Sequence, residues 1–194
     1  MNPRIHPVQI FDVKQGRLVP ASLVEPVQKK HLDEFETRWR VFPGRGGGET
    51  WHWDWGDKYR RIEKEIRYSS FALECDGETQ GLMIIELSAR SRFPGQASQH
   101  VVYVEYIEAA PWNRKDLGGQ KFKLTGQVLM AAAVDASIND GNGGRVGLHS
   151  LPGAESFYRD ICRMTDMGPD RSYSLKHPLS YFEFSEQQAK AFIS

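Results

Sequence analysis

The sequence has little cysteine, no net charge and no long apolar run. Its 194 residues include two cysteines, Cys75 and Cys162, which form no Cys-x-x-Cys pair. This scarcity excludes a disulfide scaffold and favours a reduced, cytoplasmic setting. The 25 Lys and Arg residues balance 25 Asp and Glu residues. A protein dedicated to nucleic acid usually carries a basic excess for phosphate contacts, so no nucleic-acid partner is expected.

Membrane-crossing segments are not expected either. No stretch approaches the 18 consecutive apolar residues of a transmembrane helix, and the first residues lack the apolar core of a signal peptide. Hydrophobic residues make up 40% of the chain and charged residues 26%, as in ordinary globular domains. The length favours a single domain over residues 1–194.

Hydrophobic periodicity alternates between the strand and helix patterns, which predicts an α/β or α+β domain with a mixed sheet. The run at 100–107 is rich in β-branched and aromatic residues, so it is expected to be a central strand. The other expected strands are an edge strand or hairpin within 1–24, then 70–74, 81–87, 145–150, 172–175 and 180–184. Helices are expected at 26–42, at a segment carrying Tyr59, Ile62 and Ile66, at 126–139, at 154–161 and from 185 onward.

Three tryptophans alternate within five residues, at Trp51, Trp53 and Trp55. They follow the glycine-rich segment 44–48, which is expected to be a flexible loop. One interpretation is a packed aromatic cap over the core. The other is a wall on the substrate side of a binding site.

The segment after the central strand carries the chemistry. The strand enters a glycine-containing loop, and this loop opens a helix at Thr125 and Gly126. The first N–H groups of a helix have no intrahelical partners and lie at the positive end of the helix dipole. Such an end binds phosphate or pyrophosphate readily. The loop matches neither the Walker A nor the GxGxxG pattern.

Four segments together resemble the GCN5-related N-acetyltransferase (GNAT) family. They are Ile107–Arg114, Phe122–Met130, Gly144–Ser150 and Ala154–Tyr158. The resemblance implies a mixed, mostly antiparallel central sheet with helices on both faces. It places the core motifs within 100–164.

The resemblance also implies acetyl-CoA as the co-substrate. The family's loop reads Gln/Arg-x-x-Gly-x-Gly/Ala, and its backbone N–H groups hold the pyrophosphate. Leu124 departs from this pattern, since it replaces the first glycine. The family's fourth strand pairs with the pantetheine arm, which corresponds here to Ile107 and Ala109. The implied pyrophosphate-binding residues are Lys121, Phe122, Lys123, Leu124, Thr125, Gly126 and Gln127.

Direct attack of an amine on the thioester requires a base for the amine and an acid for the departing thiolate. By resemblance, Glu105 is the candidate base and Tyr158 the candidate acid. The alternatives are an ordinary strand carboxylate paired with an arginine and a packed core tyrosine. His149, near the end of a strand, is interpreted as structural. No metal site is expected, because no third or fourth ligand accompanies His52 and Asp54 at zinc-like spacing.

The function that the resemblance implies is transfer of acetyl from acetyl-CoA to a primary amine of a small molecule or protein; the acceptor partner would be a small-molecule or peptide amine. The first alternative is a non-catalytic acyl-CoA-binding or interaction domain. A toxin that acetylates aminoacyl-tRNA is disfavoured by the balanced charge. The last strands and the terminal helix are plausible surfaces for a homodimer.

Overall fold

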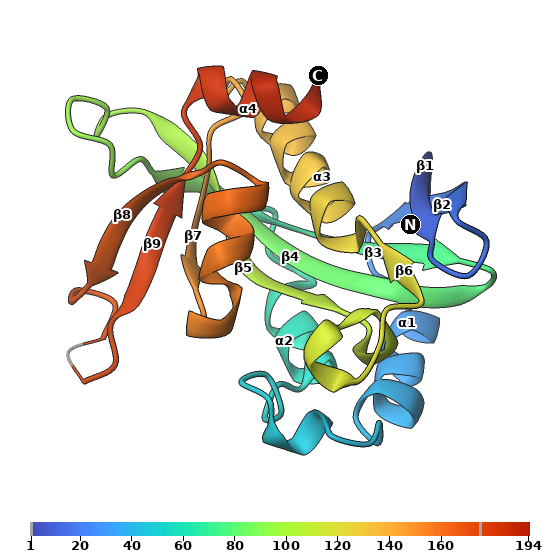
Figure 1. Cartoon of the computed structure of the whole chain (residues 1–194). Coiled ribbons are helices and arrows are strands. Elements are labelled where there is room, and N and C mark those ends of the chain that lie inside the picture. Colours follow the sequence, from blue (N-terminus) through green and yellow to red (C-terminus); the bar gives the residue numbers. More distant parts are fainter. Residues whose placement is uncertain (1, 175) are drawn as a thin grey trace. The chain divides into compact units, whose positions relative to one another are not determined.

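The computed structural model describes residues 2–174 and 176–194 (Figure 1). The strands are β1 (Arg4–Asp12), β2 (Arg17–Glu25), β3 (Tyr68–Cys75), β4 (Glu78–Arg90), β5 (His100–Ala109), β6 (Phe122–Lys123), β7 (Val146–Ser150), β8 (Thr165–Asp170) and β9 (Leu179–Glu183). The α-helices are α1 (Lys29–Glu34), α2 (Trp55–Ile62), α3 (Thr125–Asn139) and α4 (Glu186–Ile193). Two π-helical segments are η1 (Phe35–Trp39) and η6 (Phe157–Ile161). None of the helices in the described part of the chain is long and apolar enough to cross a membrane.

The strands hydrogen-bond in the order β6-β1-β2-β3-β4-β5-β7-β9-β8. The β1–β2 hairpin is antiparallel and in register from Arg4 opposite Glu25 to Asp12 opposite Arg17. β5 has a central place in the order and pairs with β7 in parallel. The prediction of a mixed, mostly antiparallel sheet with 100–107 at its centre is confirmed.

The chain clusters into two compact units. The first unit comprises Met1–Ile84 and Tyr106–Leu129, and the second comprises Ile85–Glu105 and Met130–Ser194. β4, β5 and α3 each begin in one unit and end in the other.

Helices cover both faces of the sheet in the first unit. Phe35 and Trp39, one helical turn apart, are fully buried and share a hydrophobic cluster with Leu82 of β4. The preceding β4 residue, Gly81, faces α3, where a Cβ atom would lie 2.8 Å from Leu129. Since successive strand residues point to opposite faces, the two sets of helices lie on opposite faces. This arrangement confirms the prediction for that part of the sheet.

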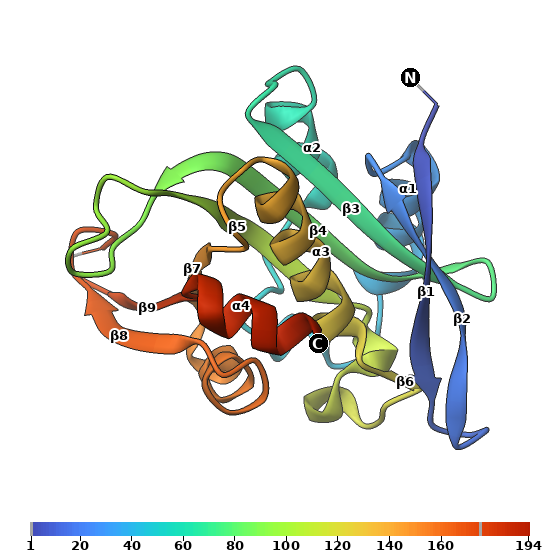
Figure 2. The same ribbon diagram turned by 90° about the horizontal axis from the view of Figure 1, so that it is seen from above.

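In the second unit, α4 lies against the C-terminal half of α3, as both views show (Figure 2). A Cβ atom on Gly144 would lie 2.9 Å from Ala189 of α4 and 3.4 Å from Val134 of α3. Ser185 caps α4, and its Oγ accepts the backbone N–H of Gln188 at 3.2 Å. The Gln188 side chain accepts the Ser185 N–H at 2.9 Å, which completes the predicted capping box.

The strand predicted at 172–175 is wrong. The strand β8 lies earlier, at Thr165–Asp170, and residues 172 and 173 belong to the turn that follows it, while residue 175 lies outside the described residues. Gly168 and Pro169 concealed this strand, because both residue types are rare inside strands. The pairing with β9 shifts register between Asp166 and Pro169, and β8 is an edge strand, where such irregularities are tolerated.

The predicted placement of Ile66 on a helical face is also wrong. α2 ends at Ile62, and the N–H of Glu65 donates to the Ile62 carbonyl in a tight turn that leads into β3. Ile66 is therefore 97% exposed.

Candidate active site

The loop before α3 depends on the conformation of Leu124, in the first unit. The φ angle of Leu124 is +72°, in the left-handed region that costs a residue with a side chain about 1–2 kcal/mol. Its carbonyl accepts the first bond of α3, from the N–H of Val128 at 2.9 Å. A left-handed residue next to helical ones aims successive N–H groups at one point, which forms an anion-binding nest. Leu124 therefore has a backbone conformation that glycine, the family's residue at this position, adopts more easily than leucine does.

The first turn of α3 carries several N–H groups that the helix itself does not use. The N–H groups of Thr125, Gly126 and Gln127 precede the first intrahelical bond and have no partner within the helix. The Thr125 side chain is buried, and its Oγ1 has no hydrogen-bond partner in the described part of the chain. An orphaned hydroxyl beside free N–H groups and the positive end of a 15-residue helix fits an anionic group such as a pyrophosphate.

The preceding residues are already engaged. The Lys121 N–H donates to the Trp112 carbonyl at 2.8 Å, and the Phe122 N–H donates to Asn113 Oδ1 at 2.9 Å. The ammonium of Lys121 donates to Glu78 Oε2 at 2.8 Å. Phe122 is buried and Lys123 is exposed. Both residues pair with β1. The donors that remain for an anion therefore begin at Leu124.

β5 continues beyond its pairing with β7. The parallel pairs are Val102 with Val146, Tyr103 with Gly147, and Val104 with Leu148. Further along β5 lie Ile107 and Ala109, both half-buried, at the positions that the resemblance assigns to the pantetheine arm.

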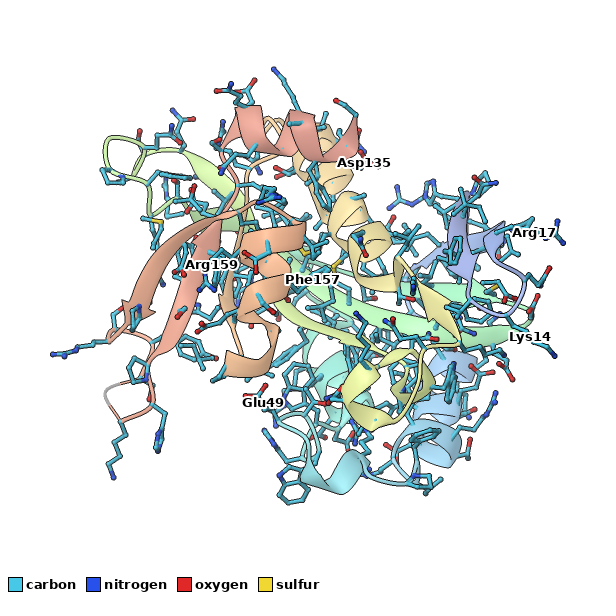
Figure 3. All side chains as sticks on the ribbon, in the orientation of Figure 1. Lys14, Arg17, Glu49, Asp135, Phe157 and Arg159 are labelled. Carbon is cyan, nitrogen blue, oxygen red and sulfur yellow. The ribbon has the colours of Figure 1, made fainter. Side chains whose placement is uncertain are left out.

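The two candidate catalytic residues belong to the second unit. Glu105 is half-buried on β5. Tyr158 lies in η6, only 5% exposed, with its ring 5.8 Å from Phe182 and 5.1 Å from Phe157, which Figure 3 labels beside Arg159. Burial raises the pKa of Tyr158, so its hydroxyl is protonated at neutral pH.

The three alternating tryptophans have different surroundings. Trp55 is fully buried, and its indole N–H donates to Glu108 Oε2 at 2.7 Å, which favours the core interpretation for this residue. Trp53 is half-buried with its ring 5.3 Å from that of Tyr106. Trp51 is 59% exposed, so its surface is open to a ligand.

Sequence reasoning missed the burial of Arg45 in the glycine-rich loop. Its guanidinium donates to Glu108 at 3.1 Å and to the Thr50 carbonyl at 3.2 Å. Thr50 Oγ1 also donates to Glu108, at 2.7 Å. The expectation of a flexible loop is wrong at this position, because a buried ion pair anchors it. Glycines on both sides of Arg45 concealed the anchor, and no spacing linked the loop to β5.

Sequence reasoning also treated His149 as structural. In the second unit, its Nδ1 lies 2.6 Å from the Tyr103 hydroxyl and its Nε2 lies 2.7 Å from Asp170 Oδ2. The three residues come from three strands that are far apart in the chain, so no motif could have revealed the cluster.

No family model matches this sequence, and no curated protein matches it. Solved structures do match. An uncharacterised protein of Bacillus halodurans aligns over 96% of this chain and 94% of its own, with a TM-score of 0.63 at 9% identity. The GNAT domain of S. lividans PAT aligns over 93% and 96%, with a TM-score of 0.60 at 12% identity. Aminoglycoside acetyltransferase AAC(6')-Ib, solved with coenzyme A and kanamycin, aligns over 89% and 99%, with a TM-score of 0.59 at 15% identity. The chain therefore has the GNAT fold, as the four sequence segments predicted.

Proposed function

We propose that this protein is an N-acetyltransferase that moves the acetyl group of acetyl-CoA to a primary amine of a small molecule or protein. The observation that carries the proposal is the left-handed Leu124 at the start of α3. This conformation retains the anion-binding nest although the glycine is absent. The coenzyme A in the AAC(6')-Ib structure, which has the same fold, gives independent support.

The residues of the first unit would hold the acyl-CoA. The N–H groups of Leu124, Thr125, Gly126 and Gln127 would bind the pyrophosphate, with the Thr125 hydroxyl as a further donor. The backbone at Ile107 and Ala109 would pair with the pantetheine arm as an added strand does. Lys121, Phe122 and Lys123 would support the loop through their contacts with its neighbours.

The reaction would be a direct transfer. A neutral amine attacks the thioester carbonyl, a C–N bond forms, and the C–S bond breaks. Glu105 would draw the proton from the acceptor ammonium, and Tyr158 would return one to the thiolate. Trp51 and Trp53 would border the acceptor amine, whereas Trp55 would support this wall from the buried core.

Binding of acetyl-CoA is the first test. At about 100 times its dissociation constant, the ligand should stabilise the protein by roughly 2.7 kcal/mol. For a chain of this size, that stabilisation raises the melting temperature by roughly 5–10 °C. The variant Gly126→Glu separates binding from folding. A carboxylate in the first turn favours the helix dipole but repels phosphate, so we expect a stable protein that has lost most of the ligand-induced shift.

Transfer is tested with a panel of amines, amino acids and peptides, with the released coenzyme A measured by a thiol reagent. The protein's own thiols should not interfere, since both cysteines are buried and burial raises the pKa of Cys162 to about 12. Turnover that depends on an amine would support the proposal. Binding without transfer to any amine would favour the non-catalytic acyl-CoA-binding alternative, and absence of both would contradict the proposal.

A further inference from the structure

A buried chain of three polar side chains connects β5, β7 and β8 within the second unit. The Tyr103 hydroxyl lies 2.6 Å from His149 Nδ1, and Asp170 Oδ2 lies 2.7 Å from His149 Nε2. The His149 side chain is 3% exposed and that of Asp170 is 13% exposed. Both imidazole nitrogens thus have a protein partner.

The chemistry of the partners determines where the protons lie. An ionised carboxylate can only accept, so Nε2 of His149 carries the hydrogen that is donated to Asp170. Nδ1 of the neutral ring is then an acceptor, and the Tyr103 hydroxyl must donate to it. This direction leaves lone-pair capacity on the Tyr103 oxygen, which can accept a hydrogen bond from another group.

Burial, more than the charged groups around it, keeps the imidazole neutral. Burial lowers the pKa of His149, and the nearby positive charge of Arg92 lowers it further, while Asp170 opposes both. Asp170 itself remains ionised, because hydrogen bonds from Ser172, His149 and Arg92 outweigh burial and hold its pKa below the usual range.

Two further aromatic rings pack against the imidazole. The ring of Tyr173 stacks on it at 4.2 Å, and the ring of Tyr181 lies 5.0 Å away. The Tyr181 hydroxyl is directed elsewhere, since it donates to the fully buried Glu183 at 2.8 Å. Of these neighbours, Tyr103 is the residue hydrogen-bonded to Nδ1, so a proton can reach that nitrogen through its hydroxyl.

Tyr103 is also coupled to the candidate base. Tyr103 and Glu105 are two residues apart on β5, so their side chains share one face of the strand. After burial, the negative charge of Glu105 is the next largest cause of the raised Tyr103 pKa. Glu105 therefore lies on the same face of β5 as a hydroxyl that is hydrogen-bonded to a neutral imidazole.

We propose that Tyr103 and His149 form a proton relay that removes the proton lost by the acceptor ammonium, with Asp170 as the positioning residue that holds the imidazole. The inference rests on the proposed acetyl transfer. Glu105 draws one proton from the ammonium and passes it to the Tyr103 oxygen. At the same time, the proton of the Tyr103 hydroxyl passes to Nδ1 of His149. The amine is then neutral and attacks the thioester, and Asp170 stabilises the imidazolium. Because the imidazole is neutral, the lone pair of Nδ1 faces the Tyr103 hydroxyl and can take the proton that this hydroxyl gives up.

The test compares the wild type with Tyr103→Phe, His149→Gln and Asp170→Asn. Kinetics are measured with acetyl-CoA and the best amine of the panel from pH 5.5 to 9, and acetyl-CoA binding is measured on the same samples. We expect each variant to lose roughly 100-fold in kcat, with little change in acetyl-CoA binding. The acidic limb of the pH profile should disappear in His149→Gln. Tyr59→Phe and His177→Gln are matched controls outside the cluster and should behave as the wild type does.

A wild-type kcat and an unchanged pH profile in Tyr103→Phe and His149→Gln would overturn the relay while leaving acetyl transfer intact. A wild type that binds no acetyl-CoA or transfers to no amine would overturn the proposed function and the relay with it. Nitrogen-15 NMR of the histidine side chains adds a readout that needs no acceptor. His149 should carry its proton on Nε2 at pH 7.5, and a proton on Nδ1 instead would contradict the relay.

Discussion

Nη2 of Arg45 lies 3.1 Å from Oε1 of Glu108, and both side chains are only 2% exposed. Glu108 also accepts from Thr50 and Trp55, so three residues of the first unit donate to one buried carboxylate. Replacement of Glu108 by glutamine would leave the Arg45 charge without a counterion. It would also place the amide NH2 group against groups that themselves donate to Glu108. We expect Glu108→Gln to lower the free energy of unfolding by about 3–5 kcal/mol, measured by urea denaturation.

The exposed pair of Lys29 and Asp33 provides the control, because its nitrogen and oxygen lie 2.6 Å apart on the surface of α1. Lys29→Gln should change stability little, since exposed ion pairs contribute little. Equal effects of Lys29→Gln and Glu108→Gln would show that the buried pair does not anchor the glycine-rich loop.

Substitutions of Leu124 should be tolerated according to how easily the new residue adopts a positive φ. Gly and Asn adopt the left-handed region readily, whereas a β-branched residue does so poorly. We expect Leu124→Gly to remain within about 0.5 kcal/mol of the wild type, because relief of strain offsets lost packing and greater freedom of the unfolded chain. Leu124→Val should cost about 1–2 kcal/mol and weaken acetyl-CoA binding. Urea denaturation and ligand titration that failed to distinguish Gly from Val would show that this backbone angle does not matter for the loop.

Gly81 should be sensitive to a single methyl group. A Cβ atom there would lie 2.8 Å from Leu129 Cδ1 and 2.9 Å from Thr125 Cγ2, both on the first turns of α3. Leu129 is fully buried, so it cannot move aside without displacing its neighbours. We expect Gly81→Ala to destabilise the protein by about 1–3 kcal/mol and to weaken acetyl-CoA binding. Gly119→Ala, with nothing within 4 Å, should match the wild type in thermal melts and titrations.

The parts of the fold that sequence predicted well are those with a strong local signal. The turn at Asp76 and Gly77 has positive φ at both residues, as an Asp-Gly hairpin requires, and the Ser185 capping box starts α4 as expected. β8 was missed because Gly168 and Pro169 interrupt the alternating pattern of a strand. The segment forms a strand through its hydrogen-bonded pairing with β9, which its own sequence does not reveal.

The candidate site divides in a similar way. The start of α3 could be located from local periodicity, but the positive φ of Leu124 could not, because a leucine gives no local signal for that conformation. Arg45 and His149 were beyond sequence reasoning for another reason. Their partners lie 63 and 46 residues away along the chain, and only the folded sheet brings them together.

Buried histidines should make stability depend on pH in a predictable direction. His31 is 1% exposed, its Nδ1 accepts the Gln28 N–H at 2.8 Å, and its Nε2 bonds to Glu74. Burial lowers the pKa of His31, as it lowers that of His149, despite the opposing effect of a carboxylate partner in each case. Below about pH 6.5, the unfolded chain therefore binds protons at His31 and His149, whereas the folded chain keeps both imidazoles neutral until the pH reaches their lowered pKa values.

The free energy of unfolding should accordingly be greatest above about pH 7 and fall as the pH drops through the range between the ordinary histidine pKa and the lowered folded values. A second loss should follow below about pH 4, where the unfolded chain protonates Glu74 and Asp170, whose folded pKa values are held low by hydrogen-bonded partners. Urea midpoints measured from pH 8 down to about pH 2 test both steps. His31→Gln and His149→Gln should each be less stable than the wild type at pH 7.5, but their stability should decline less steeply between pH 7 and pH 5. Identical slopes in the wild type and both variants would mean that neither histidine is held neutral by the fold.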